Sequence, residues 1–148
     1  MEVTVAMPDD VPRLCELLAI LFAQEHEFAP DPVKQARGLK AIIADPSIGL
    51  ILVLRKEGEI VGMVNLLFTI STFLGGKVAL LEDLIIDPAH RGKGAGTFLL
   101  QAAREKATEQ ACQRITLLTD GSNASARAFY RRMGFVESSM VPFRLMLP

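Results

Sequence analysis

The first part of the chain carries two helical patterns of apolar residues. A short strand is predicted at Val3–Met7, and Pro8-Asp9-Asp10 supplies a helix start. A second helix is expected at about Val33–Ala44, after a connection at Phe28–Pro32. In the first helix, which ends near His26, apolar residues recur at i, i+3, i+4, i+7 and i+8 and form one buried face: Leu14, Leu17, Leu18, Leu21 and Phe22.

Three longer apolar segments follow and predict an antiparallel meander. They span Ile48–Leu54, Ile60–Ile70 and Val78–Ile86, and a charged turn and a glycine turn separate them. The middle segment lies in a stretch without charged residues, but Asn65 and several hydroxyl side chains interrupt it. A membrane span needs roughly twenty predominantly apolar residues. We therefore expect a buried strand there and no membrane segment.

The second half predicts a strand–helix–strand unit. A helix from Gly94 to about Gln110 leads to a strand at Ile115–Leu118, which should run parallel to Val78–Ile86. A fourth helix, capped by Ser122 or Asn123, ends at Met133-Gly134, and closing strands are expected at Phe135–Met140 and Phe143–Leu147. This order predicts an α/β fold with one mixed, mostly antiparallel sheet and about four helices, in a single domain spanning residues 1–148.

Composition excludes several classes of protein. The chain has 148 residues, half of them hydrophobic, which is enough for one core. Its net charge of −1 argues against a nucleic-acid partner, although residues 1–75 carry −4 and residues 76–148 carry +3. Cys15 and Cys112 have no disulfide or metal-ligand spacing, so we expect no metal. The N-terminus lacks the features of a signal peptide, and we expect a soluble, cytoplasmic protein.

A glycine-spaced loop follows the most apolar strand. Val78–Ile86 is broken only by Glu82 and Asp83, and Asp87-Pro88 ends it. Arg91, Gly92, Lys93, Gly94, Ala95 and Gly96 come next, and Thr97 continues into the helix. Alternate glycines let main-chain N–H groups converge on one anion, and the helix N-terminus adds partial positive charge. The P-loop pattern is absent, and Leu99 stands where the dinucleotide fingerprint needs its third glycine.

Two motifs together resemble a known family. Arg91-x-x-Gly94-x-Gly96 after a strand with an acidic pair resembles the acyl-CoA-binding motif of the GNAT superfamily of N-acetyltransferases. The stretch from Asn123 to Phe135 matches the family pattern Asn-x-x-Ala-x-x-Phe/Leu-Tyr-x-x-x-Gly-Phe at every position. The resemblance is close over about residues 78–136. It implies a central parallel strand pair that is splayed to hold acyl-CoA.

The resemblance also implies which residues bind acetyl-CoA. The main chain of Leu84, Ile85 and Ile86 would pair with the pantetheine arm, as an added strand pairs with a sheet edge. The pyrophosphate would be held by the loop and the start of the helix, and Asn123 would reach the cofactor. The implied binding set is Leu84, Ile85, Ile86, Arg91, Gly92, Lys93, Gly94, Ala95, Gly96, Thr97 and Asn123.

Catalysis by this family would need a base and an acid. An amine with a pKa near ~10.4 must lose a proton before it attacks a thioester, and Glu82, directly or through water, is the candidate base. On a regular strand Glu82 and Asp83 point to opposite faces, so at most one of them faces the thioester. Tyr130, the only tyrosine, would protonate the departing thiolate. No Cys or Ser stands in a nucleophile arrangement, so direct attack in a ternary complex is expected.

Structural alternatives stay open for each of these residues. Glu82 could pair with a basic residue, Tyr130 could be a packed aromatic, and Asn123 could be only a helix cap. The Arg127, Arg131 and Arg132 cluster could be an exposed helix face rather than a phosphate contact. An alternative function is a non-catalytic CoA-binding module that regulates or binds other molecules.

The acceptor is bounded only loosely by the sequence. By family geometry, its entrance would be lined by Glu25–Pro32 and Leu67–Gly76. The acidic and apolar mixture of these segments favours a small cationic amine, with a protein amine as the alternative. His26, between two glutamates, could bind an amine or lie at a solvated helix end. Family members are often dimers, which leaves a homodimer open.

Overall fold

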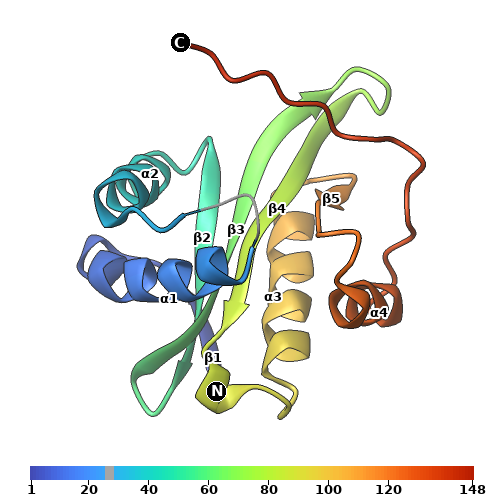
Figure 1. Ribbon diagram of the computed structural model, residues 1–148. Helices are drawn as coiled ribbons and strands as arrows, with labels where there is room; N and C mark the ends of the chain where they lie inside the picture. Colours follow the sequence, from blue (N-terminus) through green and yellow to red (C-terminus); the bar gives the residue numbers. More distant parts are fainter. Residues whose placement is uncertain (26–28) are drawn as a thin grey trace. The chain divides into compact units, whose positions relative to one another are not determined.

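The computed structural model describes residues 1–25 and 29–148 (Figure 1). These residues form two compact units, Met1–Leu118 and Thr119–Pro148, which are described separately. The predicted end of the first helix at His26, and the start of the following connection at Phe28, lie outside the described residues.

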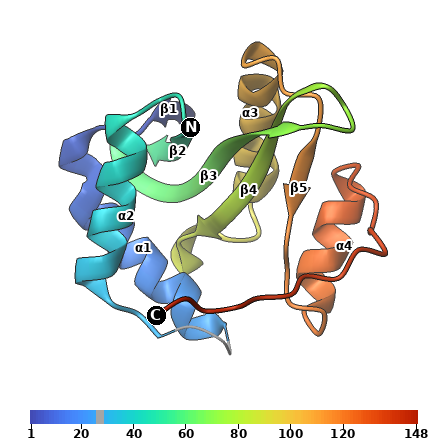
Figure 2. The same ribbon diagram turned by 90° about the horizontal axis from the view of Figure 1, so that it is seen from above.

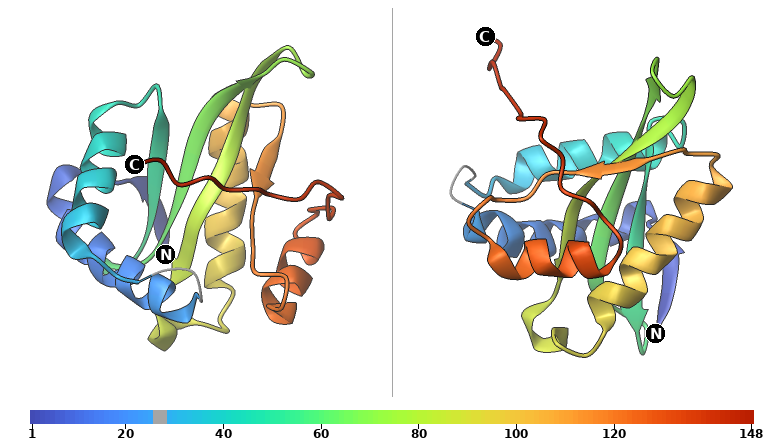
Figure 3. Two further views of the ribbon diagram at one scale, coloured as in Figure 1. Left: turned by 45° about the horizontal axis from the view of Figure 1, so that its top comes forward. Right: turned by 90° about the vertical axis from the view of Figure 1, so that its right-hand side faces the viewer.

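The first unit is built on a five-stranded sheet. Its strands are β1 (Glu2–Val5), β2 (Gly49–Lys56), β3 (Glu59–Ser71), β4 (Gly76–Ile86) and β5 (Ile115–Leu117), in the order β1-β2-β3-β4-β5. The first four strands pair antiparallel, and β4 and β5 pair parallel. The predicted mixed, mostly antiparallel sheet is thus confirmed. Figure 3 shows β3 and β4 continuing as a hairpin beyond the other strands.

Helices cover both faces of this sheet (Figure 2). On one face lie α1 (Val11–Gln24), preceded by the short helix η1 (Pro8–Asp10), and α2 (Pro32–Ala44). On the other face lies α3 (Ala95–Glu109), which follows the short helix η2 (Pro88–His90). With α4 (Ala124–Arg132) in the second unit, the described residues contain the four expected α-helices. Among those residues, no helix is both long enough and apolar enough to cross a membrane.

Alternation along the strands divides the core between the two faces. The cluster that packs with α1 includes side chains of β2, β3 and β4, among them Ile51, Met63 and Ile85, which are at most 4% exposed. On the opposite face, α3 buries Leu99 and Leu100 completely. Within β4, the residues Val78, Ala79, Leu81, Ile85 and Ile86 are buried, and Glu82 is exposed.

The two closing strands were predicted wrongly. Residues 135–148 form no strand, and Val141 and Phe143 remain 74% and 95% exposed. The apolar pattern of this segment suits a strand, but a strand also needs a partner for its ladder hydrogen bonds. Pro142 and Pro148 moreover lack an N–H to donate. In the described part of the chain, β5 is therefore the edge of the sheet.

Candidate functional site

A bulge interrupts β4 in the middle of its pairing with β3. Met63 lies opposite Ile85, but Asn65 lies opposite Glu82, so one more residue is accommodated on β4 than on β3. Asp83 at this point has a φ of 56°, a backbone conformation that residues other than glycine, asparagine and aspartate seldom adopt. The strand is therefore not regular here, whereas the expectation that Glu82 and Asp83 point to opposite faces applies to a regular strand.

Beyond the bulge, one edge of β4 has no strand paired with it in the described residues. Parallel pairing with β5 ends at Leu81 and Leu117. The N–H of Asp87 donates to Val61 of β3 (2.8 Å), so by alternation Ile85 also directs its polar groups to β3. The main-chain groups of Leu84 and Ile86 consequently face the other edge. Of the three residues implied to pair with pantetheine, these two present polar groups there.

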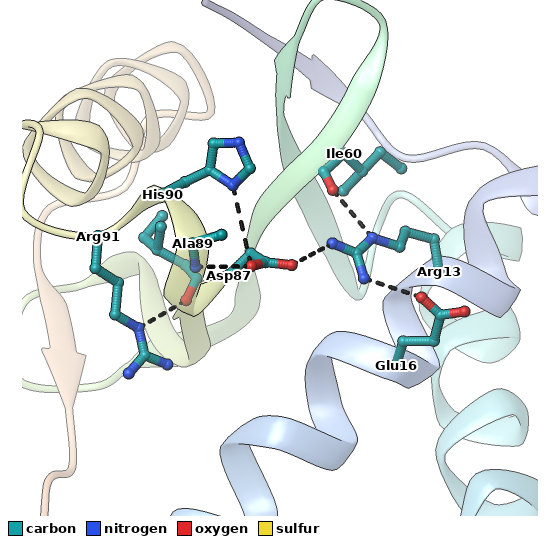
Figure 4. Close-up of polar contacts among 8 residues, drawn as sticks. Arg13, Glu16, Ile60, Asp87, Ala89, His90 and Arg91 are labelled. Atoms are coloured by element: carbon teal, nitrogen blue, oxygen red, sulfur yellow. Dashed lines mark hydrogen bonds and ion pairs between the residues drawn. The ribbon is translucent and has the colours of Figure 1, made fainter.

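The loop after β4 is fixed by side chains at its start (Figure 4). Arg91 Nε donates to the carbonyl oxygen of Ile86 (2.9 Å), and Asp87 Oδ1 accepts from the N–H of Ala89 (3.0 Å). From α1, Arg13 donates to Asp87 Oδ2 (2.6 Å) and to the carbonyl oxygen of Ile60 (3.0 Å). The hydrogen bond from Arg13 lowers the pKa of the Asp87 carboxyl. The first unit thus anchors the loop on two sides.

The glycines of the loop hold left-handed backbone conformations at the start of α3. Gly92 and Gly94 have φ values of 75° and 79°, and Gly94 is the N-cap residue of α3. The first helical hydrogen bond of this turn runs from the N–H of Phe98 to Gly94. The N–H groups of the first turn, at Ala95, Gly96 and Thr97, have no acceptor within an α-helix. With the exposed Arg91 and Lys93 beside them, they form a geometry suited to an anion.

The two carboxylates of β4 have different surroundings. Glu82 is exposed, whereas Asp83 is partly buried and accepts a 2.6 Å hydrogen bond from Asn65 Nδ2. Asn65 is only 3% exposed. Burial, together with the negative charges of Glu82 and Glu25, raises the pKa of Asp83 to about 6, against the lowering effect of the Asn65 hydrogen bond. Asp83 is not among the site residues predicted from the sequence, although Asn65, as the polar residue within an apolar strand, was a signal for a polar group here.

Asn123 and Tyr130 lie in the second unit, where only their local contacts are described. Asn123 Oδ1 accepts hydrogen bonds from the N–H of Ala126 (3.0 Å) and from Ser125 Oγ (3.2 Å), so it caps α4, as one alternative predicted. The ring of Tyr130 packs against Phe129 and Phe135, with centroids 5.4 and 5.8 Å apart. Their implied contacts with a cofactor stay predictions.

The basic residues of α4 have partners within the same unit. Arg127 and Arg131 form ion pairs with the two carboxylate oxygens of Glu137, at 2.7 and 2.9 Å. Arg132 lies over the ring of Phe129, 6.0 Å from its centroid. These contacts favour the structural alternative for the arginine cluster.

The predicted acceptor entrance is described only in part. Glu25 ends α1 as its C-cap residue, while residues 26–28, including His26, lie outside the described residues. Leu67–Gly76 forms the end of β3, the turn and the first residue of β4. Within the described residues, no group of three or more His, Cys, Asp or Glu side chains could hold a metal ion.

The model of the acetyltransferase (GNAT) family matches residues 11–135. The chain belongs to the GNAT family. It is 34% identical over 125 residues to the uncharacterized N-acetyltransferase YhfO of Bacillus subtilis (strain 168), with 82% of this chain and 83% of that one covered. A second relative, the aminoalkylphosphonate N-acetyltransferase of Salmonella typhimurium (strain LT2), is 31% identical over 101 residues, covering 68% of this chain and 65% of the relative.

Solved structures support the same fold. A possible acetyltransferase from Clostridium difficile 630 superposes with a TM-score of 0.89, covering 99% of this chain and 97% of that one at 18% sequence identity. At this identity the likeness concerns the fold alone. Family membership makes this GNAT chain an acetyltransferase, and both the expected family and the expected fold are confirmed.

Proposed function

We propose that this GNAT protein transfers an acetyl group from acetyl-CoA to an amine by direct attack in a ternary complex. The observation that carries the proposal is the continuity of β4 with the glycine loop. The edge of β4 at Leu84 and Ile86, which has no strand beside it in the described residues, leads within a few residues to Gly92 and Gly94 at the start of α3. An extended arm beside the strand and a pyrophosphate at the helix N-terminus are what an acyl-CoA presents.

The glycine loop and the edge of β4 each suit one part of acetyl-CoA chemically. The loop offers main-chain N–H groups to the pyrophosphate, and Arg91 and Lys93 supply full positive charges. The edge of β4 offers main-chain groups to the amides of pantetheine. A main-chain N–H on the same strand would stabilise the oxyanion that forms when the thioester carbonyl is attacked. Bound acetyl-CoA supplies the activated acetyl group.

The protein's part in the chemistry is proton transfer. A carboxylate of β4 takes the proton of the acceptor amine, and Glu82, directly or through water, is the candidate that the sequence supplies. The proposal assigns the protonation of the departing thiolate to Tyr130. A covalent acyl-enzyme is disfavoured, because burial raises the pKa of the Cys15 and Cys112 thiols and thereby disfavours the nucleophilic thiolate.

The charges near the bulge support a cationic acceptor. Glu25, Glu82 and Asp83 are close enough that the first two raise the pKa of the third. Such surroundings favour a positively charged group and disfavour an anionic one. The Salmonella relative, by its name, acetylates an aminoalkylphosphonate, which supports an amine as the acceptor group. We propose a small cationic amine, with a protein amine as the alternative. We also propose one domain over residues 1–148, because the family match runs through both described units.

An amine panel with free CoA thiol as the readout tests this function. Polyamines, amino acids and aminoglycosides come first and peptides second, and the expected result is amine-dependent thiol release with an acetylated product. The variant Tyr130→Phe should turn over more slowly while binding acetyl-CoA normally. Ping-pong kinetics, or unchanged turnover in that variant, would count against the mechanism. Tight acetyl-CoA binding with no thiol release for any amine would instead support the alternative function, a non-catalytic CoA-binding module.

A further inference from the structure

We propose that Asp83, held at the bulge by Asn65, is the residue that takes the proton from the acceptor amine, in place of Glu82. This inference rests on the proposed acetyl transfer and names the base and the charge state of its acceptor. Register and alternation assign the residues near the bulge to one face of the sheet. Met63 and Ile85 lie in register and both pack in the cluster beneath α1, and Asn65, two residues after Met63, lies on the same face.

Asp83 lies on that same face. It precedes Ile85 by two residues, and alternation directs such residues to one side of a strand, while β4 carries its additional residue between Glu82 and Ile85. The 2.6 Å hydrogen bond from Asn65 places the Asp83 carboxylate beside a side chain of the α1 face. Alternation and this hydrogen bond therefore both place Asp83 on the face of the sheet that α1 covers.

Burial and hydrogen bonding distinguish Asp83 from Glu82. A carboxylate in solvent, such as Glu82, is surrounded by water, whereas Asp83 is partly covered and is oriented by a buried amide. That amide has a second polar atom: Asn65 Oδ1 is buried and has no hydrogen-bond partner among the described residues. An ammonium group beside Asp83 would bring N–H donors to this buried acceptor.

The electrostatic surroundings suit a base that works near neutral pH. The groups that act on Asp83 come from three elements: Glu82 on β4, Glu25 at the end of α1 and Asn65 on β3. Burial and the two glutamates raise its pKa to about 6, so the carboxylate is ionised at pH 7 and still basic enough to accept a proton. The same negative charges attract the protonated form of an amine.

The proposed step balances with the groups already named. The ammonium transfers one proton to Asp83, and the freed nitrogen lone pair attacks the thioester carbonyl carbon. A C–N bond forms, the C–S bond breaks, and the thiolate takes a proton from the hydroxyl of Tyr130. Exchange with water then removes the proton from Asp83 and restores that of Tyr130. The acceptor that enters is thus the protonated amine.

The test is the pH dependence of kcat/KM for the best amine of the panel, at saturating acetyl-CoA. Asp83→Asn is the informative variant, because asparagine tolerates positive φ and preserves the side-chain shape. We expect kcat/KM to fall by about 100- to 10,000-fold and the acidic limb near pH 6 to disappear. Glu82→Gln, the matched neutral change on the neighbouring residue, should keep the limb and lose less than about tenfold.

A second variant tests the positioning role of Asn65. Asn65→Leu removes the hydrogen bond that lowers the pKa of Asp83, so the acidic limb should move to higher pH, which a merely structural defect would not do. Calorimetry with acetyl-CoA should give the wild-type affinity for Asp83→Asn, which establishes that its site is folded.

The outcomes separate the two proposals. If the wild type is active and the kcat/KM of Asp83→Asn is within about tenfold of the wild-type value, the inference is wrong and the proposed acetyl transfer is unaffected. The same holds if Glu82→Gln, rather than Asp83→Asn, removes the acidic limb. A wild type that binds acetyl-CoA but acetylates no amine overturns the proposed function and the inference with it.

Discussion

Replacing Gly94 by alanine isolates the contribution of the loop's backbone conformation to acetyl-CoA binding. Gly94 has a φ of 79°, and an added Cβ would meet no atom within 4 Å, so the substitution introduces backbone strain without a steric clash. The left-handed conformation costs an L-residue about 1–2 kcal/mol. Because the loop around Gly94 is exposed, we expect the variant loop to relax to another conformation in the free protein.

Binding must then restore the left-handed conformation, and this lowers the affinity. A cost of about 1–2 kcal/mol corresponds to acetyl-CoA binding that is about 5- to 30-fold weaker. Isothermal titration calorimetry measures this directly. Gly58→Ala is the matched control, since Gly58 in the β2–β3 turn has a φ of 83° and equally open surroundings. An unchanged affinity in Gly94→Ala, or an equal loss in Gly58→Ala, would refute the assignment of the loop as the pyrophosphate site.

Three further predictions concern stability. Arg13→Gln should cost about 1–3 kcal/mol in urea unfolding because it removes the hydrogen bonds to Asp87 Oδ2 and to the carbonyl oxygen of Ile60. Glu16→Gln, at the exposed end of the same network, should cost under about 1 kcal/mol. Asn123→Ala should lose about 1 kcal/mol of cap energy in thermal unfolding, and Asn123→Ser should retain most of it with unchanged acetyl-CoA affinity. Weaker acetyl-CoA binding in both Asn123 variants would instead support the predicted cofactor contact. Asp83→Asn should be more stable than the wild type at pH 8, by up to about 3 kcal/mol.

The sign of that last effect follows from the raised pKa of Asp83. As pH rises, the unfolded chain releases this proton near pH 4, whereas the folded protein retains it until about pH 6. Stability therefore falls as pH rises through this window, and the loss remains above it. The Asp83→Asn variant has no such proton, so its stability does not fall with rising pH in this window. Equal pH dependence of unfolding in the two proteins would contradict the raised pKa.

Local patterns were sufficient to predict most of the first unit. The spacing of Leu14, Leu17 and Leu18 placed α1 correctly, because one apolar stripe both forms the helix and decides which face is buried. Proline and glycine marked the ends of β4 and the start of α3, since their backbone limits act locally. The family motif added the anion site, whose geometry the glycine φ values support.

Features that depend on pairing between distant segments could not be predicted in the same way. The bulge at Asp83 arises from the register between β3 and β4, which no local pattern specifies. The family resemblance, which implies a bulge near this point, favoured Glu82 over Asp83 as the candidate base. The closing strands failed for a related reason, because Phe143 and its apolar neighbours have strand propensity but find no ladder partner in residues 135–148.

A crystal structure with bound acetyl-CoA tests the central claim most directly. We expect pyrophosphate oxygens within hydrogen-bond distance of main-chain N–H groups between Gly92 and Thr97. We also expect pantetheine amides paired with Leu84 and Ile86, and a thioester on the side of β4 that Asp83 approaches. Acetyl-CoA bound away from this edge, with the glycine loop unoccupied, would contradict the account.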